Sequence, residues 1–124
     1  MKRFKPSGEL GARMEESAAR HLQRAGLRIE ARNYRSRFGE IDLIARDGET
    51  LVFVEVRYRR SSRYGSASAT VDARKQRKLL ATADSYLQRY KPDCPCRFDV
   101  VAIDGAAEGE TPNIQWIKDA FGAH

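Results

Sequence analysis

The chain has 124 residues, enough for one compact domain and short for two, and its 41% hydrophobic and 32% charged residues exclude a disordered tail. A net charge of +6 favours polyanionic partners, because each phosphate that a protein neutralises releases counterions. No apolar run approaches the roughly 18 residues of a membrane span, and the basic N-terminus has no apolar signal region. We therefore expect a cytoplasmic protein without a membrane partner.

The first predicted element is a helix over about 8–25, where apolar residues recur at helical spacing and Gly26 marks the end. Three strands are predicted after it, at 27–34, 40–45 and 50–58. Short connections between these strands indicate an antiparallel meander.

A loop rich in Ser, Gly and Ala leads to a predicted long helix over 71–90, with Thr70 as its expected N-cap. The apolar run at 97–103 predicts a short strand that is covered on both faces. The pattern at 114–121 predicts a last short strand or turn. Because the long helix is a crossover, the strand after it should lie parallel to the strand before it. This order predicts an α/β fold in which helices flank a mixed sheet.

The Asp-Gly pair at 47–48 is the strongest hairpin signal in the chain. A two-residue turn there would pair Asp42 with Phe53 and Glu40 with Glu55, and residues opposite one another share a face of the sheet. One face would then be apolar, with Ile41, Leu43, Val52, Val54 and Val56. The open end of the other face would carry four charged residues, namely Glu40, Asp42, Glu55 and Arg57.

Carboxylates grouped in this way repel one another unless some are protonated or cations lie between them. Hard ions such as Mg²⁺ or Mn²⁺ bind a few carboxylates together with water and substrate phosphate, whereas an ion-pair cluster with Arg57 is the alternative. Glu15 lies at the edge of the apolar stripe of the first helix, and Lys75 falls at helical spacing between apolar residues of the second. Both should approach the sheet and favour a metal site, although Lys75 could instead extend along the core edge to water.

Several motifs, in this order along the chain, resemble those of the YraN-like family of uncharacterised bacterial proteins: GEIDLIARDG, FVEVRYRR, RKQRKL and RFDVV. That family is regarded as a distant branch of the PD-(D/E)xK nucleases and is similar to Holliday-junction resolvases. The resemblance implies one nuclease-like domain over 1–124 with a restriction-endonuclease-like core. It would have a flexible N-terminus over about 1–8 and a mobile loop over about 59–69.

The nuclease motif has an acid on one strand and acid-x-Lys on the next, and a helical Glu often completes the site. The resemblance therefore implies that Asp42, Glu55 and Glu15 are catalytic residues and bind Mg²⁺ or Mn²⁺. Arg57, the fourth implied catalytic residue, stands where nucleases usually have Lys. Arginine keeps its proton and cannot act as a general base, but it could hold the scissile phosphate.

The function implied is a metal-dependent endonuclease that hydrolyses phosphodiester bonds in DNA, with branched or flapped structures as candidate substrates and with RNA as the less favoured alternative. Glu40 and Lys75 would lie around the metal ligands and help to position them. Nucleic acid would contact four basic residues, Arg59, Arg60, Arg63 and Lys75, and a homodimer would suit a junction. Because Arg57 replaces the usual Lys, an alternative function is an inactive nucleic-acid-binding module of the same fold. If the acids form only an ion-pair cluster, a weaker alternative is a protein-interaction domain.

Overall fold

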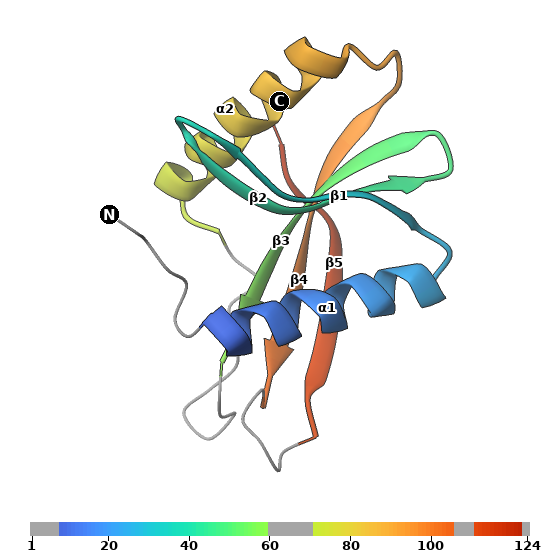
Figure 1. Ribbon diagram of the computed structural model, residues 1–124, viewed down its shortest axis with the longest axis vertical. Helices are drawn as coiled ribbons and strands as arrows, with labels where there is room; N and C mark the ends of the chain where they lie inside the picture. Colours follow the sequence, from blue (N-terminus) through green and yellow to red (C-terminus); the bar gives the residue numbers. More distant parts are fainter. Residues whose placement is uncertain (1–7, 60–70, 106–110, 123–124) are drawn as a thin grey trace.

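The computed structural model describes residues 8–59, 71–105 and 111–122, so most of the predicted N-terminal segment and of the loop at 59–69 lies outside the described residues. Within these described ranges, seven elements follow one another: α1 (Gly8–Arg24), β1 (Arg28–Ser36), β2 (Gly39–Asp47), β3 (Thr50–Tyr58), α2 (Ala73–Tyr90), β4 (Cys96–Asp104) and β5 (Asn113–Phe121) (Figure 1). The predicted α/β order is confirmed, and the last element is a full strand of nine residues.

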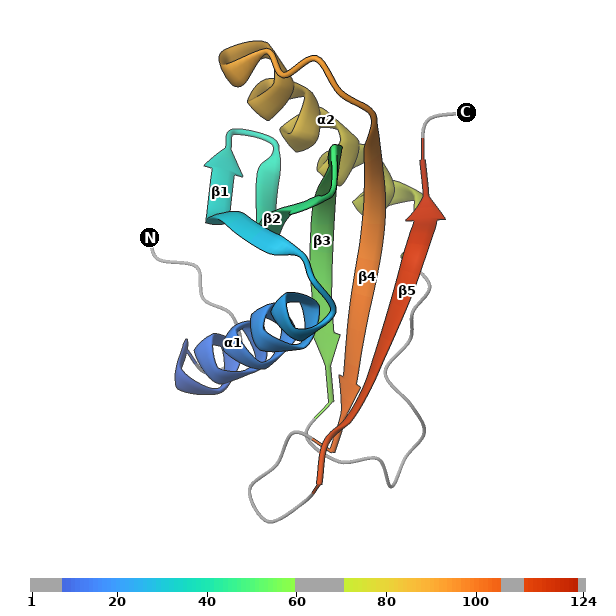
Figure 2. The same ribbon diagram turned by 90° about the vertical axis from the view of Figure 1, so that its right-hand side faces the viewer.

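The five strands form one sheet in the order β1-β2-β3-β4-β5. All neighbours are antiparallel except β3 and β4, which are parallel and are connected through α2. The prediction of a mixed sheet with a parallel strand after the crossover helix is therefore confirmed. In Figure 2, β3, β4 and β5 run side by side while the β1–β2 hairpin curls away from them.

Each helix covers its own face of the sheet (Figures 1 and 2). The α1 side of the core includes the buried residues Ala18, Leu22, Leu43, Val54 and Val101. The α2 side includes Leu79, Ala83, Phe53, Phe98 and Val100. The central residues of β2 and β3 are buried because both faces are covered there, which explains the continuous apolar sequence at the middle of each strand. No helix among the described residues is long and apolar enough to cross a membrane.

Asp72, and not Thr70, caps the N-terminus of α2. Its carboxylate Oδ1 accepts a hydrogen bond from the Lys75 backbone N–H at 2.8 Å, which satisfies one of the free N–H groups of the first turn. The helix consequently begins at Ala73, two residues later than predicted. This cap fixes the rotation of the first turn and directs the Lys75 side chain toward β3.

The β2–β3 turn differs from the predicted one by a two-residue change of register. Asp47 pairs with Thr50, so the turn consists of Gly48, at φ +62°, and Glu49. The predicted pairs of Asp42 with Phe53 and of Glu40 with Glu55 are therefore wrong. A change of two residues does not by itself move a side chain to the other face, because side chains in a strand alternate with a period of two.

Ile41 is the exception to the predicted faces. It packs in the α2-side core with Ile44 and Phe53, whereas Leu43 packs on the α1 side. Pairing of β2 with β3 ends at Leu43 opposite Val54, and beyond this point β2 pairs with β1 alone. The start of β2 is therefore free to twist, and the simple alternation between faces does not extend to Ile41.

Candidate metal and nucleic-acid site

Asp42 and Glu55 meet where β2 separates from β3. The separation leaves the Val56 backbone N–H without a strand partner, and it donates instead to Asp42 Oδ2 at 2.8 Å. Both acids are buried, with exposed fractions of 4% for Asp42 and 9% for Glu55. The hydrogen bond to Val56 therefore holds the Asp42 carboxylate beside β3, next to Glu55.

Lys75 reaches the same point from α2. Its Nζ lies 3.3 Å from Glu55 Oε2, and its side chain is half-exposed, so it faces the sheet as predicted while remaining accessible to solvent. Burial, and after it the charge of Asp42, raises the pKa of Glu55 to about 7, while Lys75 and Arg57 act in the opposite direction. Near neutral pH the site therefore carries a carboxyl group that is close to half ionised.

Glu15 and Glu40 form a second acidic pair around Asn33. With its amide nitrogen turned toward the two carboxylates, Asn33 donates to Glu40 Oε2 at 2.9 Å and to Glu15 Oε1 at 3.1 Å. Arg35 Nε lies 3.5 Å from Glu40 Oε2. Glu15 of α1 is thus connected to the strand that carries Asp42, as the apolar setting of Glu15 in its helix indicated.

Asn33 is a site residue that sequence reasoning missed. It has a left-handed backbone, at φ +52°, within β1. Asn tolerates this conformation better than most residues, and its presence inside a predicted strand is the signal that could have drawn attention to it.

The basic residues of the prediction occupy different places. Arg57 is half-buried and lies two residues after Glu55, so both side chains extend from the same face of β3. Arg59 is exposed just after β3, and its backbone N–H donates to the Ile103 carbonyl at 2.9 Å. The predicted DNA contacts of Arg60 and Arg63 lie outside the described residues.

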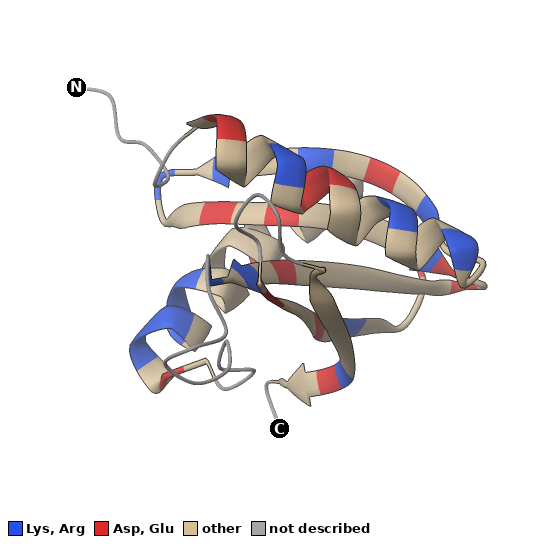
Figure 3. Ribbon diagram, turned by 90° about the horizontal axis from the view of Figure 1, so that it is seen from below, with Lys and Arg blue, Asp and Glu red and all other residues tan. Residues whose placement is uncertain are grey.

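Lys and Arg residues are concentrated in the first turns of α2. Figure 3 marks the backbone positions of these residues as blue bands on α2, the helix at the lower left. They are Arg74, Lys75, Arg77 and Lys78, and the first turn contains no acid. Cations are unfavourable at a helix N-terminus, where the macrodipole is positive. This end of α2 therefore combines two sources of positive potential beside Glu55.

The described residues bring Asp42 together with Glu55 and Glu15 together with Glu40. Within the same residues there is no group of three His, Cys, Asp or Glu side chains placed to hold a metal ion. Asp42 and Glu55 present carboxylate oxygens from two neighbouring strands, and oxygen donors of this kind fit a hard divalent ion such as Mg²⁺. A metal at this pair would need water or a substrate phosphate to complete its coordination.

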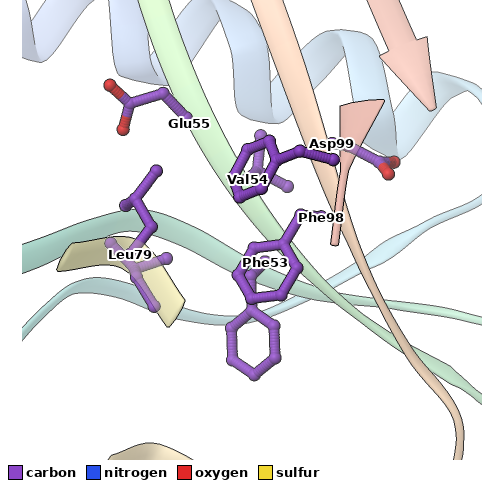
Figure 4. A pocket seen from close by; sticks show the side chains of 8 residues that line it. Phe53, Val54, Glu55, Leu79, Phe98 and Asp99 are labelled. Atoms are coloured by element: carbon purple, nitrogen blue, oxygen red, sulfur yellow. The ribbon is translucent and has the colours of Figure 1, made fainter. Parts of the chain in front are cut away.

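A further buried acid, Asp99, belongs to a separate structural network. It is fully buried on β4, and its carboxylate accepts hydrogen bonds from the Arg97 guanidinium, from Trp116 Nε1 at 2.9 Å and from the Asp119 backbone N–H at 2.9 Å. Glu55 and Asp99 both line a small, mostly apolar pocket, but Figure 4 shows their carboxylates pointing away from each other. Asp99 is therefore not part of the candidate site.

Comparison with known proteins places these features in a family. The sequence model described as "Uncharacterised protein family UPF0102" matches residues 14–103, which include all four acids of the site. A UPF0102 protein of Dechloromonas aromatica is 53% identical over 91% of this chain and 88% of its own length. Another, from Nitrosomonas europaea, is 50% identical over 93% of this chain and 95% of its own. These similarities confirm the predicted relationship to a family of uncharacterised bacterial proteins.

Proposed function

The chain belongs to the uncharacterised protein family UPF0102, and we propose that it is a metal-dependent nuclease that hydrolyses phosphodiester bonds in DNA. The observation that carries this proposal is the meeting of buried Asp42 and Glu55 where β2 and β3 separate, with Lys75 of α2 at 3.3 Å from Glu55. The order of helix, three-stranded meander, crossover helix and parallel strand supports a restriction-endonuclease-like core.

Asp42 and Glu55 would hold Mg²⁺ or Mn²⁺, with Glu15 and Glu40 positioning water at the open side of the pair. When bound, the metal would lower the pKa of a water molecule and polarise the scissile phosphate. Arg57 would bind the phosphate and stabilise the negative charge that develops on its oxygens, because its guanidinium stays protonated and cannot take a proton from water.

The basic surface supports nucleic acid as the substrate. The net charge is +6, and the arginines and lysines at the start of α2 lie beside the acidic pair. Such a surface attracts the DNA backbone without reading its sequence. Arg59, Lys75 and the arginines of the 59–69 loop would supply these contacts, so structure preference is expected over sequence specificity. A homodimer would present two such sites to a branched substrate.

A second candidate function is an inactive nucleic-acid-binding module. Two observations favour it: Arg57 in the position of the usual Lys, and the ion pairs that the acids make with Lys75 and Arg35. In this alternative the acids bind no metal ion, and only the basic surface is functional.

A cleavage panel separates the two functions. Single-stranded, duplex, flap and junction DNA, with matching RNA, would be incubated with protein and Mg²⁺ or Mn²⁺. We expect the wild type to cut at least one branched DNA, and the Asp42→Ala/Glu55→Ala variant to be slower by at least about 100-fold, because the metal ligands are absent. Wild-type and variant proteins that bind DNA equally and cut nothing would instead establish the inactive module.

A further inference from the structure

Phe38 is an exposed aromatic residue at the tip of the β1–β2 hairpin. Ser36 pairs with Gly39, so Arg37 and Phe38 form the turn, which we call the hairpin tip. The Phe38 side chain is 44% exposed, and the Arg37 guanidinium lies 5.0 Å from the centre of its ring. Turns favour Gly, Asn and Asp, so the turn itself does not require an aromatic residue.

The hairpin tip is fixed against α2. The Phe38 backbone N–H donates to Ser36 Oγ at 3.0 Å, and Ser36 Oγ donates in turn to Thr82 Oγ1 at 3.2 Å. Gly39 lies directly against α2, since a Cβ atom there would be 3.5 Å from Thr82 Oγ1 and 3.8 Å from Lys78 Cβ. The backbone that carries Phe38 is therefore held in place before any ligand binds, which reduces the entropy lost on binding.

The hairpin tip is also close to the acidic site. Phe38 precedes Asp42 by four residues, which corresponds to roughly 13 Å along an extended strand. Stacked DNA repeats about every 3.4 Å along one strand, so this separation is about four nucleotide steps. Lys78 and Lys75 are three residues apart on α2 and connect the tip to Glu55 through adjacent positive charges.

From this arrangement we propose that Phe38 stacks on an unpaired base, a few nucleotides from the phosphate held at Asp42 and Glu55. The ring would thereby make the protein selective for DNA in which duplex meets single strand, because a base within a continuous duplex has no free face. This inference rests on the proposed function for the position of the phosphate. Stacking of a base on an aromatic side chain is sequence-tolerant.

The test is DNA binding in Ca²⁺ or EDTA, measured by fluorescence anisotropy on a flap DNA and on a blunt duplex of the same length. Phe38→Ala is expected to weaken flap binding by roughly 10- to 100-fold, the usual effect of removing one stacked aromatic residue, and to leave duplex binding unchanged. Phe38→Trp should restore flap binding. A 2-aminopurine at the unpaired position should be quenched by the wild type and by Phe38→Trp but not by Phe38→Ala.

Tyr90→Ala is the matched control. Tyr90 is 54% exposed on the last turn of α2 and has an arginine, Arg89, at 5.4 Å from its ring centre, so it resembles Phe38 in chemistry but not in location. Its loss should change neither flap binding nor quenching. The inference is overturned if Phe38→Ala and Tyr90→Ala behave alike, or if the wild type binds flap and duplex DNA equally. A flap preference that depends on Phe38, in a protein that cuts nothing, would uphold the inference and refute the nuclease.

Discussion

Glu55→Gln is expected to make the metal-free protein more stable at pH 8 and, at the same time, to abolish its metal-dependent cleavage. Burial and the charge of Asp42 raise the pKa of Glu55 to about 7 in the folded protein, against 4.5 for an unperturbed glutamate. Between these two values the folded protein holds a proton that the unfolded chain has released. The free energy of unfolding therefore falls as pH rises from about 4.5 to 7.

The total loss is on the order of 3 to 4 kcal/mol, because the free energy of unfolding falls by about 1.4 kcal/mol for each pH unit between the two pKa values of Glu55. Glutamine does not ionise, so the variant avoids this loss and should melt roughly 10 to 15 °C higher than the wild type at pH 8. The melting temperatures of the two proteins should become equal as the pH approaches 4.5. Thermal unfolding in EDTA, followed by circular dichroism between pH 4.5 and 8, measures the difference.

Glu16→Gln is the control, because Glu16 is an exposed glutamate of α1 that pairs with Arg20 and Arg32 on the surface. It should give no gain in stability at pH 8. If the difference in melting temperature between the wild type and Glu55→Gln did not change between pH 4.5 and 8, the raised pKa of Glu55 would be refuted. A joint gain in stability and loss of activity is the usual signature of a functional site whose charges are held close together.

Arg57 is the second residue for which we expect a large effect. Arg57→Ala should slow cleavage by about 100- to 1,000-fold, because it removes a positive charge that stabilises the transition state. Arg57→Lys should stay within about tenfold of the wild type, because an ammonium group can hold the same phosphate. Single-turnover rates on the DNA that the wild type cuts best would measure both variants.

Arg89→Ala, at the opposite end of α2 from Lys75, provides a control for the loss of one positive charge. It should cut at the wild-type rate. Wild-type cleavage by Arg57→Ala would show that Arg57 has no role in the reaction. If Arg57→Lys were much faster than the wild type at high pH, the lysine would be acting as a base, and the arginine would represent a partial loss of activity.

The sequence sufficed to bring Asp42 and Glu55 together because that inference depends only on the alternation of side chains along the strands. Glu40, which was expected beside Glu55, lies instead with Glu15 of α1 around Asn33. The register of the β2–β3 hairpin was wrong by two residues, yet Glu55 kept its face because side chains alternate with a period of two. The placement of Ile41 failed because alternation holds only while a strand is paired regularly on both sides. Local pattern therefore predicts faces well inside a sheet and poorly where strands separate.

Contacts that depend on irregular backbone could not be predicted from the sequence. The bridge from Asn33 to Glu15 and Glu40 needs a left-handed residue inside β1 and the packing of α1 above it. The hydrogen bond from Val56 to Asp42 exists only because β2 leaves β3 at that position. Both features lie where the regular sheet ends, and both determine how the acids are held.

Calorimetric titration of the metal-free protein with Mn²⁺ at pH 8 tests most directly the claim that Asp42 and Glu55 hold a divalent metal. The wild type and the Glu16→Gln control are expected to bind the ion, and Asp42→Ala/Glu55→Ala is expected to show no binding at the same concentrations while remaining folded by circular dichroism. A wild type that gives no binding heat at millimolar Mn²⁺, or a double variant that binds as tightly as the wild type, would contradict a metal site at this pair.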